Sequence, residues 1–342
     1  MLSTRLKGAT ATAKVEYIAV SHATTPFVSA YPWSVSGFGA KFADPATLPT
    51  STGYDVAFSP TGNAIAVSHA SLPRISAYPW SGSGFGTKFA DPATRPGLIG
   101  YGVTFSPAGD AIAVAQSSSP FISTYPWSGS GFGVRFANPA TLPTGEGHGV
   151  AFSPSGNAIA VAHFTSPNIS VYPWSGSGYG TKFADPATLP AGAGLNVAFS
   201  PAGDAIAVAH DTGSISAYPW SGSGFGVKYA NPATPPTGIG YDVAFTPAGN
   251  AIAVAHNTTP FISAYPWSVA GFGTKFSNPA TLPTGDGFGV AFNYNSNAIA
   301  VGHTTTPFIT AYPWSVAGFG TKFSNPATLP TGNANGVAFG AI

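Results

Sequence analysis

The apolar positions of this chain occur in runs of four to six residues, and Pro, Gly, Ser or Asn separates each run from the next. Residues 149–190 read GVAFSPSGNAIAVAHFTSPNISVYPWSGSGYGTKFADPATLP, and the runs VAFS, AIAVAH, NISVY and TKFA show no helical period. Runs of this length between turn-forming residues indicate short β-strands. We therefore expect four strands in this stretch, joined by tight turns.

Both faces of these predicted strands are apolar. Small Ala side chains occupy one face, and Ile, Val or Phe occupy the other. A single β-sandwich would leave one polar face on each sheet, whereas these strands need cover on both faces. We expect the bulky face of one sheet to pack against the small face of the next.

The same pattern recurs seven times along the 342 residues. All seven tryptophans stand in a YPW triplet, at Trp33, Trp80, Trp127, Trp174, Trp220, Trp267 and Trp314. The spacing is 47 residues except for one step of 46, where a residue is missing between His210 and Trp220. A period of this length filled with strands is typical of a propeller blade. The sequence predicts an all-β protein, a seven-bladed β-propeller with four-stranded blades.

The two ends of the chain predict how the ring closes. The first-strand run VAF occurs for the last time in GVAFGAI at the C-terminus, whereas the chain begins with a second-strand run, VEYIAVSH. We expect the C-terminal strand to complete the first blade, which removes exposed sheet edges. Residues 15–342 then form the propeller, and residues 1–14 are left as an N-terminal arm that could dock on a partner.

The run VAFSPSGNAIAVAH, followed by a third strand that ends in an aromatic residue, resembles the WD-repeat and related seven-bladed propellers over residues 15–342. Most units lack Gly-His before the first strand, and PWS stands where that family has Trp-Asp. We therefore do not extend the buried His–Asp hydrogen-bond network of the WD-repeat family, or that family's usual partners, to this protein. The near-identical, weakly charged repeats also resemble propeller proteins of tailed bacteriophages, which implies a virion component.

Composition narrows the classes of function. Charged residues make up 7% of the chain and the net charge is +1 without a basic run, so we expect no nucleic-acid partner. The absence of cysteine excludes disulfides, thiolate metal sites and a cysteine nucleophile. We expect no membrane insertion and no secretory signal, because the chain lacks an apolar run of about 18 residues and an apolar segment near its start. Nothing in the sequence indicates a cofactor.

Three residue types recur in every unit, and each has an architectural interpretation. Histidine ends the second strand in six units, at His22, His69, His163, His210, His256 and His303, and Gln116 replaces it in the seventh. A shared metal site is disfavoured, because equivalent atoms on neighbouring blades should lie ~9 Å apart. We expect each of these side chains to bond to a nearby turn, a role that glutamine can also fill.

The loop SGSGFG and its variants supply the other two recurrent types. Its aromatic residue is Phe38, Phe85, Phe132, Tyr179, Phe225, Phe272 or Phe319, which could form a ring of stacking faces for sugars or, as we favour, pack under its own hairpin. The basic residue that follows is Lys41, Lys88, Arg135, Lys182, Lys228, Lys275 or Lys322. Lysine on an outermost strand protects against edge-to-edge aggregation.

The repeats differ mainly in two loops, the one before the first strand and the turn after the second, which should lie on the same face of the propeller. Variable loops on a rigid scaffold commonly carry binding sites, although neutral drift would produce the same variation. The residues that best suit recognition are Tyr54, Tyr101, Glu146, His148, Tyr241, Asp286 and Phe288. We predict these seven as the binding residues.

These observations favour a non-enzymatic structural or binding propeller, a phage decoration, fibre or tail protein located in the virion. Its expected partners are other virion or scaffold proteins and a host-surface glycan. A multivalent carbohydrate-binding lectin is the alternative. A propeller hydrolase or lactonase is the third and least favoured possibility. Outside the recurrent positions, Glu146 and His148 are the only acid and histidine close together in sequence, and they have no evident third partner.

Overall fold

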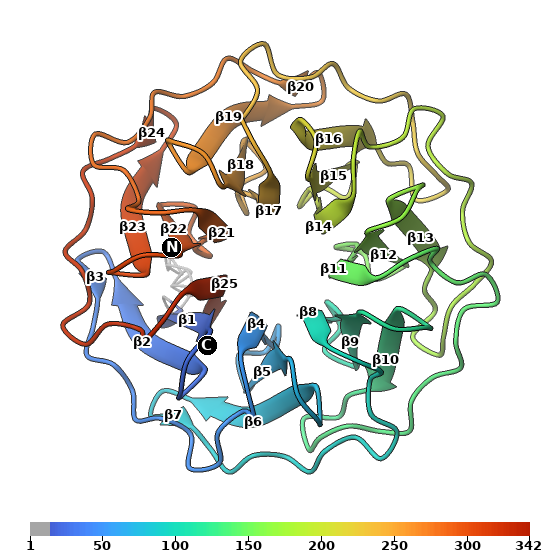
Figure 1. Ribbon diagram of the computed structural model, residues 1–342, viewed down its shortest axis with the longest axis horizontal. Helices are drawn as coiled ribbons and strands as arrows, with labels where there is room; N and C mark the ends of the chain where they lie inside the picture. The colour runs from blue at the N-terminus through green and yellow to red at the C-terminus, as the bar shows by residue number, and fades with distance from the viewer. Residues whose placement is uncertain (1–13) are drawn as a thin grey trace, which may run out of the picture.

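In the computed structural model, which describes residues 14–342, seven small antiparallel sheets surround a central axis (Figure 1). This confirms the predicted all-β, seven-bladed propeller. Between residues 14 and 342 there is no helix that could span a membrane. Apart from Lys14, the predicted arm of residues 1–14 lies outside the described residues.

Each blade runs outward from an inner strand beside the axis. The inner strands are β4 (Gly53–Phe58), β8 (Gly100–Phe105), β11 (Gly147–Phe152), β14 (Gly194–Phe199), β17 (Gly240–Phe245), β21 (Gly287–Phe292) and β25 (Ala334–Ala341). The second strands are β1 (Glu16–His22), β5 (Ala64–His69), β9 (Ala111–Gln116), β12 (Ala158–His163), β15 (Ala205–His210), β18 (Ala251–His256) and β22 (Ala298–His303). The third strands are β2 (Val28–Ser34), β6 (Ile75–Ser81), β10 (Ile122–Pro126), β13 (Ile169–Pro173), β16 (Ser214–Pro219), β19 (Ile262–Ser268) and β23 (Ile309–Ser315).

The ring closes inside one blade, as predicted. Strand β25 pairs antiparallel with β1 from Glu16 opposite Ala341 to His22 opposite Ala334. Blade one therefore has the strand order β25-β1-β2-β3, with its inner strand from one end of the chain and the others from the opposite end. In Figure 1 the dark red β25 lies beside the blue β1. Blades two to seven follow in chain order.

Neighbouring blades pack through unlike faces, which confirms the predicted arrangement. At the interface of blades four and five, the alanines of β12 lie in one apolar cluster with Ile206 and Trp220 of the next blade. Trp220 meets Phe183, Phe199 and Phe225 edge-on at ring-centroid distances of 5.2 to 5.7 Å. Each such aromatic pair contributes about 0.5–1.5 kcal/mol beyond the area it buries. The same cluster recurs between the other blades.

The fourth strand is shorter than predicted and lies elsewhere in the sequence. It is present as β3 (Gly37–Phe38), β7 (Gly84–Phe85), β20 (Gly271–Phe272) and β24 (Gly318–Phe319), and blades three to five have a single bridge instead. The predicted strand TKFA makes one backbone bond to the third strand in blade two, from Phe89 N to Ala77 O at 2.9 Å. The Phe89 ring then turns to Trp127 of the next blade, 5.2 Å away. The segment leaves the sheet because its phenylalanine fills the blade interface.

The buried histidines at the ends of the second strands bond within their own blades. In blade four, His163 Nε2 lies 3.0 Å from Ser170 Oγ, and Nδ1 lies 2.7 Å from the Thr165 carbonyl oxygen. Because a carbonyl only accepts, Nδ1 is the donor and Nε2 accepts from the serine. In blade three, Ser123 Oγ donates to Gln116 Oε1 at 2.8 Å. These bonds confirm the predicted hydrogen-bonding role and the equivalence of Gln116.

The recurrent aromatic and basic residues lie at the outer part of each blade. Phe38 packs edge-on against Tyr31 and Trp33, with ring centroids 5.7 and 5.1 Å apart, and the other blades repeat this contact. This is the packing role favoured from the sequence. Lys41 pairs with Asp44 three residues later, and in other blades an asparagine takes the place of the aspartate.

Candidate functional site

Each inner strand contains a β-bulge next to the central channel. In blade two, Gly53 pairs with His69 and Asp55 pairs with Ser68, so Tyr54 between them has no partner. A bulge turns the side chain of the extra residue away from its place in the ladder. The extra residues of the seven bulges form a ring that we call the collar: Tyr54, Tyr101, His148, Leu195, Tyr241, Phe288 and Asn335.

The residue before each bulge is glycine in six blades, and close packing requires it. A Cβ atom on Gly53 would lie 2.6 Å from the carbonyl oxygen of Phe27 in the preceding blade, and one on Gly147 would lie 2.2 Å from that of Phe121. These distances are too short for a carbon beside a backbone oxygen. Glycine therefore lets neighbouring blades approach each other at the level where the channel is lined.

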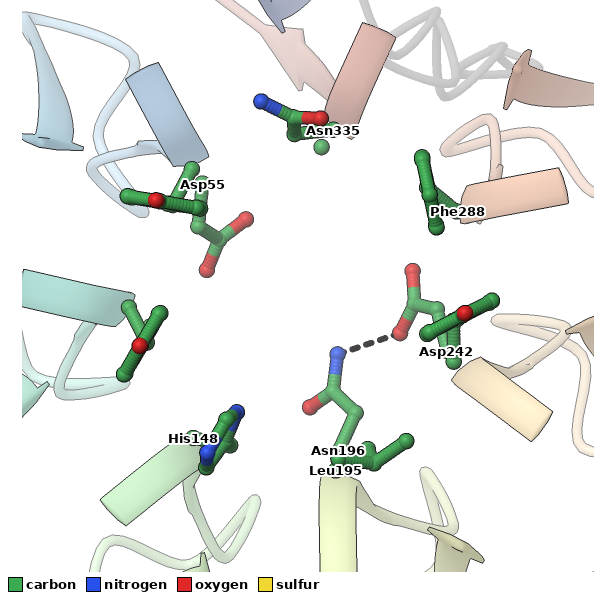
Figure 2. A pocket seen from close by; sticks show the side chains of 12 residues that line it. Asp55, His148, Leu195, Asn196, Asp242, Phe288 and Asn335 are labelled. Atoms are coloured by element: carbon green, nitrogen blue, oxygen red, sulfur yellow. Dashed lines mark hydrogen bonds between the residues drawn. The ribbon is translucent and has the colours of Figure 1, made fainter. Parts of the chain in front are cut away.

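The residues directly after the collar form a second tier, one step further along each inner strand: Asp55, Gly102, Gly149, Asn196, Asp242, Gly289 and Gly336. The collar and five residues of the second tier line a cavity of about 260 Å³ at the centre of the ring; the five are Asp55, Gly102, Asn196, Asp242 and Gly336. In Figure 2 the side chains of Asp55 and Asp242 reach into this cavity from opposite sides. We call this cavity the central pocket.

Backbone amides hold both carboxyl groups of the second tier. Asp55 accepts the N–H of Val56 at 2.8 Å on Oδ1 and that of Val103, in the next blade, at 2.9 Å on Oδ2. Asp242 repeats this arrangement with Val243 and Val290, both at 2.7 Å. Each carboxyl group thus links two blades, and its orientation is fixed.

Asp242 has one further partner. Asn196 Nδ2 donates to Asp242 Oδ1, the contact drawn as a dashed line in Figure 2. The Asn196 side-chain oxygen accepts the N–H of Val197 at 2.7 Å, which fixes the direction of the amide group. Asp242 therefore accepts one more hydrogen bond than Asp55 does.

The environment shifts the pKa of both carboxyl groups towards neutral pH. Burial raises the pKa of Asp55 to about 6, against two backbone hydrogen bonds that lower it. Burial also raises the pKa of Asp242 to about 7, and the negative charge of Asp55 adds to this shift. Both groups consequently change protonation state near neutral pH, which a surface aspartate does not.

Aromatic rings occupy most of the collar. Tyr54 and Tyr101 meet edge-on at 5.0 Å, and Tyr241 and Phe288 do so at 4.5 Å. Tyr101 also stacks on His148, with centroids 4.3 Å apart and planes 8° from parallel. The mouth of the pocket is therefore lined by rings on two opposite sides.

His148 is the collar's only titratable group other than the tyrosines. Burial lowers its pKa to about 4, so its ring is neutral at neutral pH. Within residues 14–342 its Nε2 atom is buried without a hydrogen-bond partner, and Glu146 Oε2 lies 3.8 Å away, beyond hydrogen-bond distance.

The structure brings five of the seven predicted binding residues together in the collar: Tyr54, Tyr101, His148, Tyr241 and Phe288. Glu146 and Asp286 do not line the pocket. They lie two positions earlier, where their carbonyl oxygens accept the N–H groups of Phe164 and Thr304 from the turn after the second strand. These bonds also confirm that the two variable loops lie on the same face.

The comparison of the seven repeats with one another missed the second tier, and with it Asp55, Asn196 and Asp242. A signal was present, because the position three before the inner-strand phenylalanine reads Asp, Gly, Gly, Asn, Asp, Gly, Gly around the ring. That position lies within the strand and not within the variable loop. A search for variation confined to the loops therefore does not find it.

Comparisons with known proteins support the fold. No family model matches the sequence, and no curated protein matches it. A putative 6-phosphogluconolactonase from Bacteroides fragilis superposes with a TM-score of 0.77 at 13% identity, over 96% of this chain and 99% of the other. The periplasmic gluconolactonase of Pseudomonas aeruginosa gives 0.70 at 12% identity, over 95% and 99%. The likeness establishes the fold alone.

A second putative 6-phosphogluconolactonase, from Bacteroides uniformis, gives a TM-score of 0.71 at 14% identity over 95% of this chain and 99% of that one. Similar propellers are thus named as lactonases. The prediction of a non-enzymatic virion or lectin propeller is overturned by these neighbours. The sequence interpretation considered only the variable loops as the asymmetric part of the ring, whereas the second tier carries two acidic groups that five blades lack. The resemblance to WD-repeat proteins stays a prediction.

Proposed function

We propose that this protein hydrolyses small cyclic esters (lactones) in the central pocket. The observation that carries the proposal is the pair of carboxyl groups, Asp55 and Asp242, whose pKa values lie near neutral pH inside a cavity of about 260 Å³. A general base is most effective when its pKa lies near the working pH. The names of the similar propellers support the same class of reaction.

In the proposed reaction Asp242 is the general base. Its carboxylate accepts a proton from water as the water oxygen bonds to the carbonyl carbon of the lactone. When the tetrahedral intermediate collapses, the ring C–O bond breaks, and Asp242 returns the proton to the departing ring oxygen. One lactone and one water molecule give one hydroxy acid, and no other reactant is consumed.

The neighbours of Asp242 suit this role. Asn196 and the N–H groups of Val243 and Val290 hold the carboxyl group in one orientation. They also favour its ionised form, which opposes the effect of burial and keeps the pKa from rising further. The hydroxyl groups of the collar tyrosines are candidates to contact the lactone oxygens, because Tyr54, Tyr101 and Tyr241 line the same cavity.

The proposal is tested with Asp242→Asn. Asparagine cannot accept the proton, so we expect kcat to fall about 10²- to 10⁴-fold. The fold accepts this change, because Asn196 occupies the equivalent position in blade five. Acid release from a panel of γ- and δ-lactones, corrected for spontaneous hydrolysis, gives the rate. In the unchanged protein the rate should rise with pH through about 7, since only the ionised Asp242 accepts a proton.

A matched control is Asp204→Asn. Asp204 lies in the hairpin after β14, outside the central pocket, and accepts a hydrogen bond from Ser200 at 2.6 Å. The equivalent residues in blades two, four, six and seven are already asparagine. This variant should hydrolyse lactones at the unchanged rate. Equal activity of Asp242→Asn and Asp204→Asn, or no turnover of any lactone above background, would contradict the proposed function.

A further inference from the structure

The charges that line the central pocket are negative. Among residues 14–342, twelve line the pocket; two of them are aspartates, and none is lysine or arginine. The basic residues that recur in every blade lie far out, where Lys41, Lys88 and Lys182 pair with aspartates of the same loop. The guanidinium group of Arg74, in the turn after β5, donates to the carbonyl oxygens of Ala70 and Gly97. A phosphate group in the pocket would therefore meet carboxylates and no cation.

The collar adds aromatic rings to this negative charge. In blade two, Tyr54 precedes Asp55, and in blade six, Tyr241 precedes Asp242, so each carboxyl group lines the cavity together with an aromatic residue of its own strand. Phe288 and Tyr101 extend the two pairs of rings. The faces of aromatic rings carry partial negative charge and attract cations, most strongly where water is displaced.

We propose that the central pocket binds an organic cation, with an amine or quaternary ammonium group beside Asp55 and the collar rings around it. Asp55 is the anchor of this charge because its carboxyl group accepts only two backbone N–H groups, whereas the side chain of Asn196 already donates to Asp242. If the proposed function holds, the substrate is a lactone that carries a protonated amine and not a phosphorylated lactone.

The arrangement is compatible with the proposed chemistry. The negative charge of Asp55 contributes to the raised pKa of Asp242. A cation beside Asp55 offsets that charge, so it increases the ionised fraction of Asp242 at neutral pH. Binding of the cation therefore favours the form of Asp242 that accepts a proton.

The test uses two ligands of the same shape that differ in charge, choline and 3,3-dimethylbutan-1-ol. Their binding to the full chain is measured by titration calorimetry at pH 7.5. We expect choline to bind at least about tenfold more tightly than the neutral alcohol. Asp55→Asn should abolish this difference, whereas the control Asp204→Asn should retain it. Asparagine at position 55 has its counterpart in Asn196.

Equal binding of the two ligands, or no binding of choline, would overturn the inference. This comparison is made within the unchanged protein, so it decides the question even if Asp55→Asn fails to fold. Choline binding without lactone turnover would reject the proposed function and leave the cation site standing. Turnover of neutral and phosphorylated lactones without a preference for choline would support the proposed function and reject the cation site.

Discussion

At the scale of single residues, the buried histidines make the stability of the folded protein sensitive to acid. Burial lowers the pKa of the six strand-end histidines to about 4, as it does for His148. In the unfolded chain the same groups take up protons near pH 6.5. Since the unfolded state binds more protons between these values, stability is full above about 6.5 and is lost as the pH falls towards 4.

The variant His69→Gln tests this dependence at one position. Blade three shows that glutamine can replace the histidine, because Gln116 bonds to Ser123 as His69 Nε2 bonds to Ser76. We expect the variant to lose about 1–2 kcal/mol less of its free energy of unfolding between pH 7.5 and 5 than the unchanged protein. Urea unfolding at the two pH values measures the difference. An equal loss in both proteins would assign the acid sensitivity to other groups.

At the residue scale the sequence predicted roles better where the repeats agree than where they differ. The hydrogen-bonding role of the histidines followed from Gln116, which can replace a hydrogen bond but not a metal ligand. The second tier was missed because the burial that raises the pKa of Asp55 and Asp242, and two of the backbone amides that hold their carboxyl groups, depend on the neighbouring blade. That neighbour is fixed by packing in space and not by the local sequence.

At the scale of the strand, the second tier is crowded. A Cβ atom on Gly149 would lie 2.5 Å from the Cα atom of Asn196 in the next blade. One on Gly102 would lie 2.6 Å from the carbonyl oxygen of His148. The glycines of the second tier therefore keep neighbouring inner strands close together beside the pocket.

The variant Gly149→Ala measures this crowding. We expect it to lower the free energy of unfolding by about 1–3 kcal/mol, because the inner strands of blades four and five must separate. Gly82→Ala is the matched control, since valine occupies the equivalent position at Val35, Val269 and Val316. That variant should stay within about 0.5 kcal/mol of the unchanged protein. Similar unfolding curves for the two variants would refute the argument from crowding.

The sequence located the first three strands of each blade and misplaced the fourth. Turn-forming residues mark the ends of the first three strands. The phenylalanine of TKFA packs in the interface with the next blade, and a local sequence pattern does not reveal that contact. The bulges were equally hidden. A residue such as Tyr54 has no ladder partner only because Gly53 and Asp55 pair with consecutive residues of β5.

At the scale of the molecule, the ring depends on β25. It is the inner strand of blade one and also contacts the neighbouring inner strands β4 and β21. Removing residues 334–342 would expose one edge of β1 and uncover the small face of blade seven and the bulky face of β4 in blade two. We expect the shortened protein to aggregate or to melt at lower temperature without a single cooperative transition. Size-exclusion chromatography and thermal unfolding would show this, and an unchanged monomer with an unchanged melting curve would contradict it.

The fold could be predicted at this scale and the function could not. Seven copies of one strand pattern, with a displaced last copy, are enough to indicate a closed propeller. The same repetition drew attention to what the blades share, and the virion hypothesis rested on it. The pocket chemistry depends on two aspartates among seven equivalent positions, which become neighbours of one cavity only when the ring is closed.

The seam inside blade one has a consequence for copy number. Strands β25 and β1 come from opposite ends of the chain and pair within one sheet, so this pairing does not depend on how many whole units lie between them. The sequence contains seven units, so the ring closes only if the angle between adjacent blades matches that number. That angle follows from the thickness of the layer in which alanines meet tryptophan and phenylalanine. The thickness of the tryptophan layer thus determines how many units can close a ring: a thinner or thicker layer would need a chain with another number of units, and the central pocket would then have another diameter.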